Sequence, residues 1–123
     1  MIGRIDEVVF DCANPPALAA FWAQVLGGEA KGRDDSWWYV DPPGWTRIAF
    51  QRVPEGKVVK NRVHLDVRVG TGLVGEERLA ALLAEEARLL PLGATRVLLQ
   101  EADDENESCL TLQDVEGNEF CLD

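Results

Sequence analysis

One stretch decides the fold: Asn61-Arg62-Val63-His64-Leu65-Asp66-Val67-Arg68-Val69 holds the only histidine and alternates apolar with polar residues. Successive side chains of a strand point to opposite faces, so the pattern predicts a strand over 61–69. Its core-facing set is Val63, Leu65, Val67 and Val69. The opposite, polar face carries Arg62, His64, Asp66 and Arg68. His64 is then either a functional group on an open face or an ordinary residue of a half-buried strand.

The first half of the chain has the pattern of a strand, a helix and three further strands. The helix is predicted to begin after Asn14, whose side chain can cap free N–H groups, and to end at Gly27-Gly28. Its apolar stripe repeats at helical spacing and consists of Leu18, Phe21, Trp22, Val25 and Leu26. Strands are predicted over 4–11, 29–32, 36–40 and 46–53, with a turn at 33–35.

The second half repeats this order. A helix with Glu76-Glu77 in its first turn follows the 61–69 strand and ends before Pro91. Its predicted buried stripe consists of Leu79, Leu82, Leu83, Ala87 and Leu90. Three strands follow over 95–100, 109–113 and 119–122. The repeat relates Glu7 to His64 at an offset of 57 residues, Gly28 to Gly93 at 65, and Phe50-Gln51 to Phe120-Cys121 at 70.

The composition is that of a folded chain with excess negative charge. A length of 123 residues suits one domain, and a hydrophobic fraction of 46% argues against disorder. The net charge of −10 opposes binding to nucleic acid or to anionic membranes. No apolar run has the length of a membrane-spanning helix, and the N-terminus lacks the apolar segment of a signal peptide, so a cytoplasmic protein is expected. The three cysteines have no C-x-x-C spacing, which predicts reduced thiols.

Seven motifs stand out when the chain is read in order. They are Asp11-Cys12-Ala13, Leu18-Ala19-Ala20-Phe21-Trp22, Leu26-Gly27, Phe50-Gln51-Arg52-Val53, Asn61-Arg62-Val63-His64-Leu65-Asp66, Leu92-Gly93-Ala94 and Asp114-Val115-Glu116-Gly117-Asn118-Glu119-Phe120-Cys121. Their order and spacing resemble the glyoxalase, bleomycin-resistance and extradiol dioxygenase superfamily, also called vicinal oxygen chelate, and within it the glyoxalase-like domain. The resemblance implies an α+β fold in which two βαβββ modules, 1–56 and 61–123, form a single domain over 1–123. The paired modules would form a curved mixed sheet around a cleft, and relatives suggest a homodimer.

In metal-dependent members of this superfamily, the first and last strands of each module each supply one ligand to a divalent cation. The resemblance carries these positions onto Glu7 and Gln51 in the first module and onto His64 and Cys121 in the second. Glu7, His64 and Cys121 are donors that can hold zinc. Gln51 is a poor ligand, however, and a mixed set of donors does not select one metal. A divalent metal is therefore an open but not a favoured cofactor.

His64 keeps three interpretations at this stage. It is a neutral imidazole hydrogen-bonded to Asp66, to Gln51 or to water; it is a metal ligand; or it serves in binding or acid–base chemistry, because an imidazole titrates near neutral pH. In the last case Glu7 and Asp66 are its natural partners. Cys121 is either a small polar residue that lines the cleft or a nucleophile.

The resemblance implies that the cleft binds a small organic molecule. The proposed lining residues are Gln51, Cys121, Arg62, Asp66 and Trp38. An enzyme of this kind would be a lyase or isomerase that moves a proton beside a carbonyl, with His64 or Glu7 as base and Arg62 or a metal stabilising negative charge. The alternative is a metal-free, drug-sequestering protein of the bleomycin-resistance type, whose acidic surface and tryptophans hold a cationic aromatic ligand. A third interpretation is an interaction module with a vestigial cleft, since one architecture hosts many functions.

Overall fold

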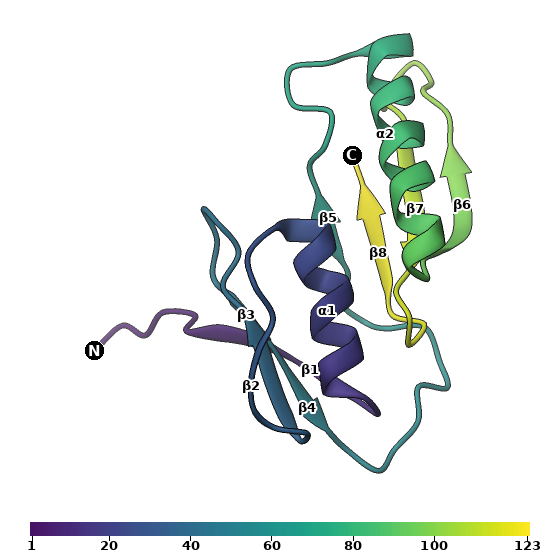
Figure 1. Ribbon diagram of the computed structural model, residues 1–123. Coiled ribbons are helices and arrows are strands. Elements are labelled where there is room, and N and C mark those ends of the chain that lie inside the picture. The colour runs from purple at the N-terminus through teal and green to yellow at the C-terminus, as the bar shows by residue number, and fades with distance from the viewer. The chain divides into compact units, whose positions relative to one another are not determined.

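The computed structural model describes residues 1–123 as two units, Met1–Val58 and Val59–Asp123, which are treated in turn (Figure 1). Their boundary falls in the connection that the sequence predicts between the two modules. Each unit has one helix and one four-stranded mixed sheet, so the fold is α+β, as expected. Neither helix is long and apolar enough to cross a membrane.

The first unit follows the predicted order of strand, helix and three strands. Its elements are β1 (Glu7–Cys12), α1 (Pro15–Leu26), β2 (Lys31–Asp34), β3 (Trp37–Val40) and β4 (Arg47–Arg52). The strands lie in the order β1-β4-β3-β2. The β1–β4 pair is parallel, and the other two pairs are antiparallel.

Helix α1 confirms the prediction at both ends. The Asn14 side chain accepts a hydrogen bond from the backbone N–H of Ala17 at 3.3 Å, and the helix ends at Gly27, whose φ of 84° suits glycine. The apolar stripe faces the sheet: Trp22 is only 1% exposed, and its ring meets that of Phe10 edge-on with centroids 5.5 Å apart. This packing fixes α1 on the sheet that contains β1.

The turn between β2 and β3 begins two residues later than predicted. Strand β2 runs through Arg33 and Asp34, which the sequence assigned to the turn, and the chain reverses at residues 35–36. The reason is local: the Asp34 carboxylate accepts a hydrogen bond from the backbone N–H of Ser36 at 2.8 Å and so closes the turn itself.

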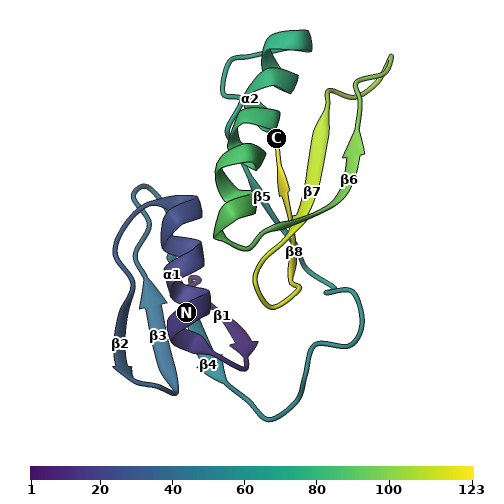
Figure 2. The ribbon, with the colours of Figure 1, turned by 45° about the vertical axis from the view of Figure 1, so that its right-hand side comes forward.

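The second unit repeats the topology. Its elements are β5 (Leu65–Val67), α2 (Gly75–Leu89), a 3-10 turn (Leu90–Leu92), β6 (Thr95–Gln100), β7 (Cys109–Gln113) and β8 (Glu119–Leu122). The strands lie in the order β5-β8-β7-β6, with β5 parallel to β8. Figure 2 shows α2 running alongside this sheet. Strands β6, β7 and β8 have the bounds that the sequence predicts.

Strand β5 is shorter than the predicted strand over 61–69. Asn61 lies outside it but is held to β8 by its side chain, because Asn61 Nδ2 donates to the carbonyl of Glu119 at 3.2 Å and Asn61 Oδ1 accepts from the Glu119 N–H at 2.8 Å. A bend at Arg62 and Val63 follows, and Val63 is 77% exposed rather than in the core. From His64 onwards the predicted alternation holds, with Leu65 partly buried and Asp66 exposed.

The buried face of α2 also differs from the prediction. Its buried residues are Leu82, Glu86 and Leu89, whereas Leu83, Ala87 and Leu90 are exposed. A carboxylate tolerates this place because Arg96 of β6 donates two hydrogen bonds to it, with Nε 2.6 Å from Glu86 Oε2. The pattern of apolar residues alone could not reveal a buried position occupied by a paired charge.

In the second unit, alternate residues of the sheet separate a core face from a polar face. Leu110, Leu112 and Phe120 are fully buried, as expected for the face that meets α2. Cys109 and Thr111 alternate with the two leucines and are half-buried on the other face. The candidate functional residues of this unit lie on that second face.

Candidate functional site

Three side chains with metal-binding atoms meet on the polar face of the second unit, and they are called the donor cluster here. His64 comes directly before β5, Asp66 lies within β5 and Cys121 lies within β8. The parallel register sets Asp66 opposite Cys121, and His64 shares the face of Asp66 because it is two residues away. One ligand atom from each of the three lies within 4.8 Å of the others.

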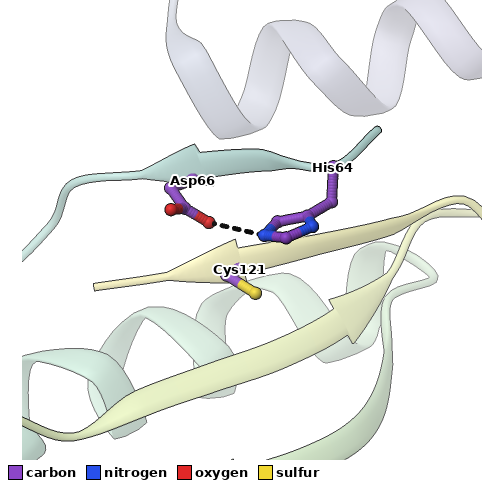
Figure 3. Close-up of side chains that lie close together, drawn as sticks. All are labelled: His64, Asp66 and Cys121. Atoms are coloured by element: carbon purple, nitrogen blue, oxygen red, sulfur yellow. Dashed lines mark ion pairs between the residues drawn. The ribbon is translucent and has the colours of Figure 1, made fainter. Parts of the chain in front are cut away.

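The members of the donor cluster differ in exposure. His64 Nε2 lies 3.2 Å from Asp66 Oδ1, and both side chains are about half exposed. Cys121 is 8% exposed, and its Sγ lies 3.3 Å from the hydroxyl oxygen of Thr111. Figure 3 shows the imidazole and the carboxylate facing each other on the side of β8 that carries Cys121. The cluster thus combines one covered thiol with two groups that small molecules can reach.

A second thiol lies beside the cluster. Cys109 and Cys121 are both free, and Cys109 is half-buried on β7. Burial, followed by the neighbouring Cys121 and then by the negative charges of Asp66 and Asp123, raises the pKa of Cys109 to about 11. Cys109 is therefore a protonated thiol at neutral pH.

Asn61 and Glu119 fix the segment that leads into His64. The carboxylate of Glu119, which is 7% exposed, accepts from the backbone N–H of Asn61 at 2.9 Å and from Gln113 Nε2 at 3.2 Å. Together with the two amide contacts of the Asn61 side chain, these bonds tie the segment to β8 three residues before His64. The backbone entering the cluster is therefore anchored on the strand that carries Cys121.

The remaining predicted site residues occupy several places. Glu7 is half-buried at the start of β1 opposite Arg47, and Gln51 is exposed on β4 opposite Asp11. The pKa of Arg47 is raised, mainly by its hydrogen bond to Asp41. The negative charge of Glu7 is a smaller cause of the same shift. Arg62 is exposed in the bend before His64. The structure thus brings His64, Asp66 and Cys121 together, and the roles of Glu7, Gln51 and Arg62 stay predictions.

Trp38 is packed within the hairpin of the first unit. Its indole covers Gly32 so closely that a Cβ at position 32 would lie 2.2 Å from Trp38 Cε2. The indole Nε1 is buried without a hydrogen-bond partner. These contacts give Trp38 a role in joining β2 to β3, while its predicted role in ligand binding remains untested.

The register of the parallel pairs refines the internal repeat. Asp11 lies opposite Gln51, and Asp66 lies opposite Cys121. If Gln51 is equivalent to Cys121, then Asp11 is equivalent to Asp66, and the offset between the two units is 55 residues at this strand. The predicted offset of 57 matched Glu7 with His64, whereas the register places Val9 at the His64 position. The two choices differ by two residues and therefore share one face of the strand.

Sequence reasoning named Asp66 as a partner of His64 and as a residue that lines the cleft, but not as a metal ligand, and it overlooked Cys109, Asn61 and Glu119. The sequence did contain a signal for Cys109. Cys109 and Cys121 lie in two consecutive predicted strands, and polar and apolar residues alternate in both. No comparable signal marked Asn61, whose side chain replaces a backbone pairing that only the folded chain displays.

The donor cluster fits a divalent cation of the zinc class. It offers an imidazole nitrogen, a carboxylate oxygen and a thiol sulfur, which are the three types of protein ligand that zinc accepts. The sulfur makes the set softer than the oxygen-rich sites that suit magnesium or calcium. Asp66 thus supplies a donor within the second unit that the sequence-based ligand set had lacked.

Two βαβββ units, the second with a compact donor cluster beside its closing strand, define the class of protein to which the chain belongs. The model of the glyoxalase-like domain matches residues 7–122. The chain belongs to this family and, with it, to the vicinal oxygen chelate superfamily. The comparison with curated protein sequences gives no match.

Solved structures share the fold at low sequence identity. A glyoxalase/bleomycin resistance protein/dioxygenase family enzyme from Burkholderia phytofirmans is 19% identical with a TM-score of 0.71, covering 95% of this chain and 94% of that one. A variant of the fosfomycin resistance protein FosX from Listeria monocytogenes, complexed with Mn(II) and 1S,2S-dihydroxypropylphosphonic acid, is 12% identical with a TM-score of 0.74, covering 99% and 90%. A protein from Agrobacterium tumefaciens is 18% identical with a TM-score of 0.74, covering 98% and 96%.

Proposed function

We propose that this protein binds a small organic molecule and converts it in a lyase- or isomerase-type reaction assisted by a divalent cation. One observation carries the proposal: His64, Asp66 and Cys121 place three different donor atoms within 4.8 Å of one another on one sheet face. The family supports it, and so does FosX, whose structure holds Mn(II) together with a small organic acid.

His64, Asp66 and Cys121 would hold the cation. When bound, a divalent cation polarises a substrate oxygen and so stabilises the negative charge that develops during proton transfer beside a carbonyl. Asn61 keeps the His64 segment on β8, and Thr111 holds the thiol of Cys121. These contacts keep the three donors in one place before any ligand arrives, which lowers the cost of binding.

Other residues enter the proposal as predictions from the sequence. Glu7 is proposed as the base that removes the proton, and Gln51 as a group that binds substrate. Arg62, an exposed cation two residues before His64, is proposed to attract an anionic part of the substrate. A homodimer also remains a prediction of the resemblance.

A second candidate function is metal-free binding of a small molecule, of the drug-sequestering kind. The contact of 3.2 Å between His64 Nε2 and Asp66 Oδ1 favours it, because this contact gives both groups a partner without any cation. For a metal-free binding protein, the net charge of −10 would favour a cationic ligand. Salt-sensitive binding without turnover distinguishes this candidate from the enzyme.

The first experiment measures metal content in protein purified without chelator. We expect about one equivalent of a divalent metal in the wild type, and a loss of more than tenfold in affinity in His64→Ala and Cys121→Ser, since even residues behind the ligands affect metal affinity by about 10–100-fold. Cys12→Ala, which removes the buried cysteine of the first unit, is the matched control and should keep its metal. Substoichiometric metal in the wild type, even after loading with zinc, would end the metal-assisted form of the proposal.

The second experiment measures proton exchange. The protein is incubated in D₂O with a panel of small 2-hydroxy ketones, and loss of the proton beside the carbonyl is followed by NMR. Glu7→Gln should slow exchange by about 10²–10⁴-fold if Glu7 is the general base. If Glu7→Gln lowers the exchange rate by less than about tenfold, Glu7 is not the general base.

A further inference from the structure

A row of three side chains crosses the sheet of the first unit on the face away from α1. The register sets Asp11 of β1 opposite Gln51 of β4, and Gln51 opposite Trp37 of β3. The Phe50 ring lies on the α1 side, where it meets Phe10, and the next residue, Gln51, therefore points to the other face. A carboxylate, an amide and an indole thus lie side by side on three neighbouring strands.

The side chains of this row make no interactions within the chain. Asp11 and Gln51 are exposed, and neither side chain has a hydrogen bond or an ion pair. No aromatic ring or guanidinium stacks on Trp37, whereas Arg47 already covers the ring of Tyr39, the next aromatic residue on this face, at 3.9 Å. The row is therefore available to a ligand.

Trp37 is the tryptophan that is best placed to stack on a ligand. Trp38 shares the face of Phe50 and packs over Gly32. Trp37 is half-buried, so the sheet holds its ring while part of the ring surface stays accessible. A ring held in this way loses little freedom when a flat molecule stacks on it, which lowers the cost of binding.

The charges around the row favour a positive ligand. No cation of the chain pairs with Asp11, whose carboxylate is exposed. Asp34 of β2 lies on the other side of Trp37 but pairs with Arg33 at 3.5 Å, so it contributes less. An indole face also attracts cations. An unpaired carboxylate near an indole therefore prefers a flat cation to a neutral or anionic molecule of the same shape.

The positive side chains on this face are directed toward a different carboxylate. Arg47 donates a hydrogen bond to Asp41 at 2.8 Å. This bond and, to a smaller extent, the charge of Lys31 lower the pKa of Asp41. These two cations therefore do not neutralise Asp11.

We propose that Asp11, Gln51 and Trp37 bind a flat organic cation, whose ring system stacks on the indole and whose positive group pairs with the Asp11 carboxylate. The amide of Gln51 lies between them and can hydrogen-bond to the edge of the ligand. Asp11 and Trp37 are two strand spacings apart, about 10 Å, which suits a bicyclic ring with its charge at one end. The inference rests on the second candidate function, metal-free binding of a cationic molecule, and gives it a place and a ligand class.

The test uses the full chain and two probes of the same shape. Naphthalene-2-carboxamidine is a cation at neutral pH, and naphthalene-2-carboxamide is neutral. Isothermal titration calorimetry at low salt, with chelator present, measures both affinities. The amidine should bind at least about tenfold more tightly than the amide, because hydrogen bonds to charged groups are the stronger ones. Added salt should weaken binding of the amidine and leave that of the amide unchanged.

Variants assign the binding to the row. Trp37→Ala should weaken binding of both probes by about tenfold, the size of a stacking contribution, and Trp37→Phe should restore part of the loss. Asp11→Asn should remove the preference for the amidine and leave the affinity for the amide unchanged. The matched controls are Trp45→Ala, at an exposed tryptophan, and Asp6→Asn, at an exposed aspartate before β1, and both should bind like the wild type.

The outcomes separate this inference from the proposed functions. If the amide binds as tightly as the amidine, or if Trp37→Phe and Asp11→Asn both bind the amidine like the wild type, the inference is wrong and small-molecule binding stands. If the wild type binds neither probe, the inference fails together with the second candidate function. Metal content and proton exchange test the metal-assisted function independently. Asp11→Asn changes an exposed residue, so the test stays decisive even if Trp37→Ala does not fold.

Discussion

The parallel strand pairs β1–β4 and β5–β8 have the same register and different chemistry. Asp11 lies opposite Gln51 in the first unit, as Asp66 lies opposite Cys121 in the second. Two residues before these aspartates the first unit has Val9, where the second has His64. At these three equivalent positions the first unit has a valine, an aspartate and a glutamine, whereas the second unit has the three residues of the donor cluster. The comparison teaches that the repeated topology fixes equivalent positions, while the side chains at these positions differ between the two units.

The units also differ in what holds each helix to its sheet. Helix α1 buries a wholly apolar set that includes Trp22, whereas α2 buries Glu86 and depends on its ion pair with Arg96. The Arg96 hydrogen bonds lower the pKa of Glu86, since they favour the charged form. Apolar packing hardly depends on pH, so the second unit should be the more sensitive to acid.

Trp22→Ala should have the largest effect on stability. The indole is only 1% exposed, and removing a buried large side chain costs about 3–5 kcal/mol in the free energy of unfolding. Urea denaturation measures the loss, and hydrogen exchange shows which strands lose protection. We expect the strands of the first unit to lose most. Trp45→Ala, at a position that is 56% exposed, is the control and should cost less than about 0.5 kcal/mol.

Glu86→Ala should have an intermediate effect. It removes two charge-assisted hydrogen bonds from Arg96, which is 43% exposed and can return to water, so the expected cost is about 1–3 kcal/mol. Glu85→Ala on the same helix breaks the Glu85–Arg88 pair and is the matched control, with an expected cost below about 1 kcal/mol. Equal costs for the two variants would show that the buried pair does not distinguish α2.

The same pair predicts a pH dependence. Because the pKa of Glu86 is lowered on folding from a value of 4.5, its contribution to stability is present above that pH and is lost as pH falls through the lowered pKa. Glu86→Gln should therefore be less stable than wild type near neutrality and approach it in acid. Urea midpoints between pH 7 and pH 3 test this, and a constant difference over that range would contradict it.

The smallest expected effect concerns the helix starts. Asn14 caps α1, but the corresponding residue of α2 is Val74, which makes no capping hydrogen bond and is 68% exposed. Val74→Ser should stabilise the second unit by about 0.5–1 kcal/mol, because a serine oxygen can accept from a free N–H of the first turn. The measurement is the urea midpoint. Val74→Ala lacks the oxygen and should show no gain from capping.

Much of the fold was predictable because local signals agreed with the tertiary structure. Asn14, the apolar stripe through Trp22 and the glycines at 27 and 28 located α1 correctly. The three strands after α2 were also correct, since turns or acidic loops separate them. The predicted face of α2 was correct at Leu82 but wrong at its C-terminal end, because a distant residue, Arg96, makes burial of Glu86 favourable.

The site was predictable in part. Alternation placed His64 and Asp66 on one face, and the family resemblance added Cys121, but no sequence pattern gives the distance between two strands. The register of β5 against β8 is what brings Asp66 to Cys121. The position of Cys109 beside Cys121 depends in addition on the register of β7 against β8. Such pairings arise from packing between segments that are far apart in sequence.

Asn61 has a consequence for tolerance to change in sequence and length. Its side chain joins β8 independently of β5, so the short bend at Arg62 and Val63 is held at both ends. The bend itself is exposed, and Val63 has no place in the core. It can therefore vary in side chain, and even lengthen slightly, without loss of either anchor. Such variation offers a route by which the reach of the imidazole could be retuned while the rest of the fold stays unchanged.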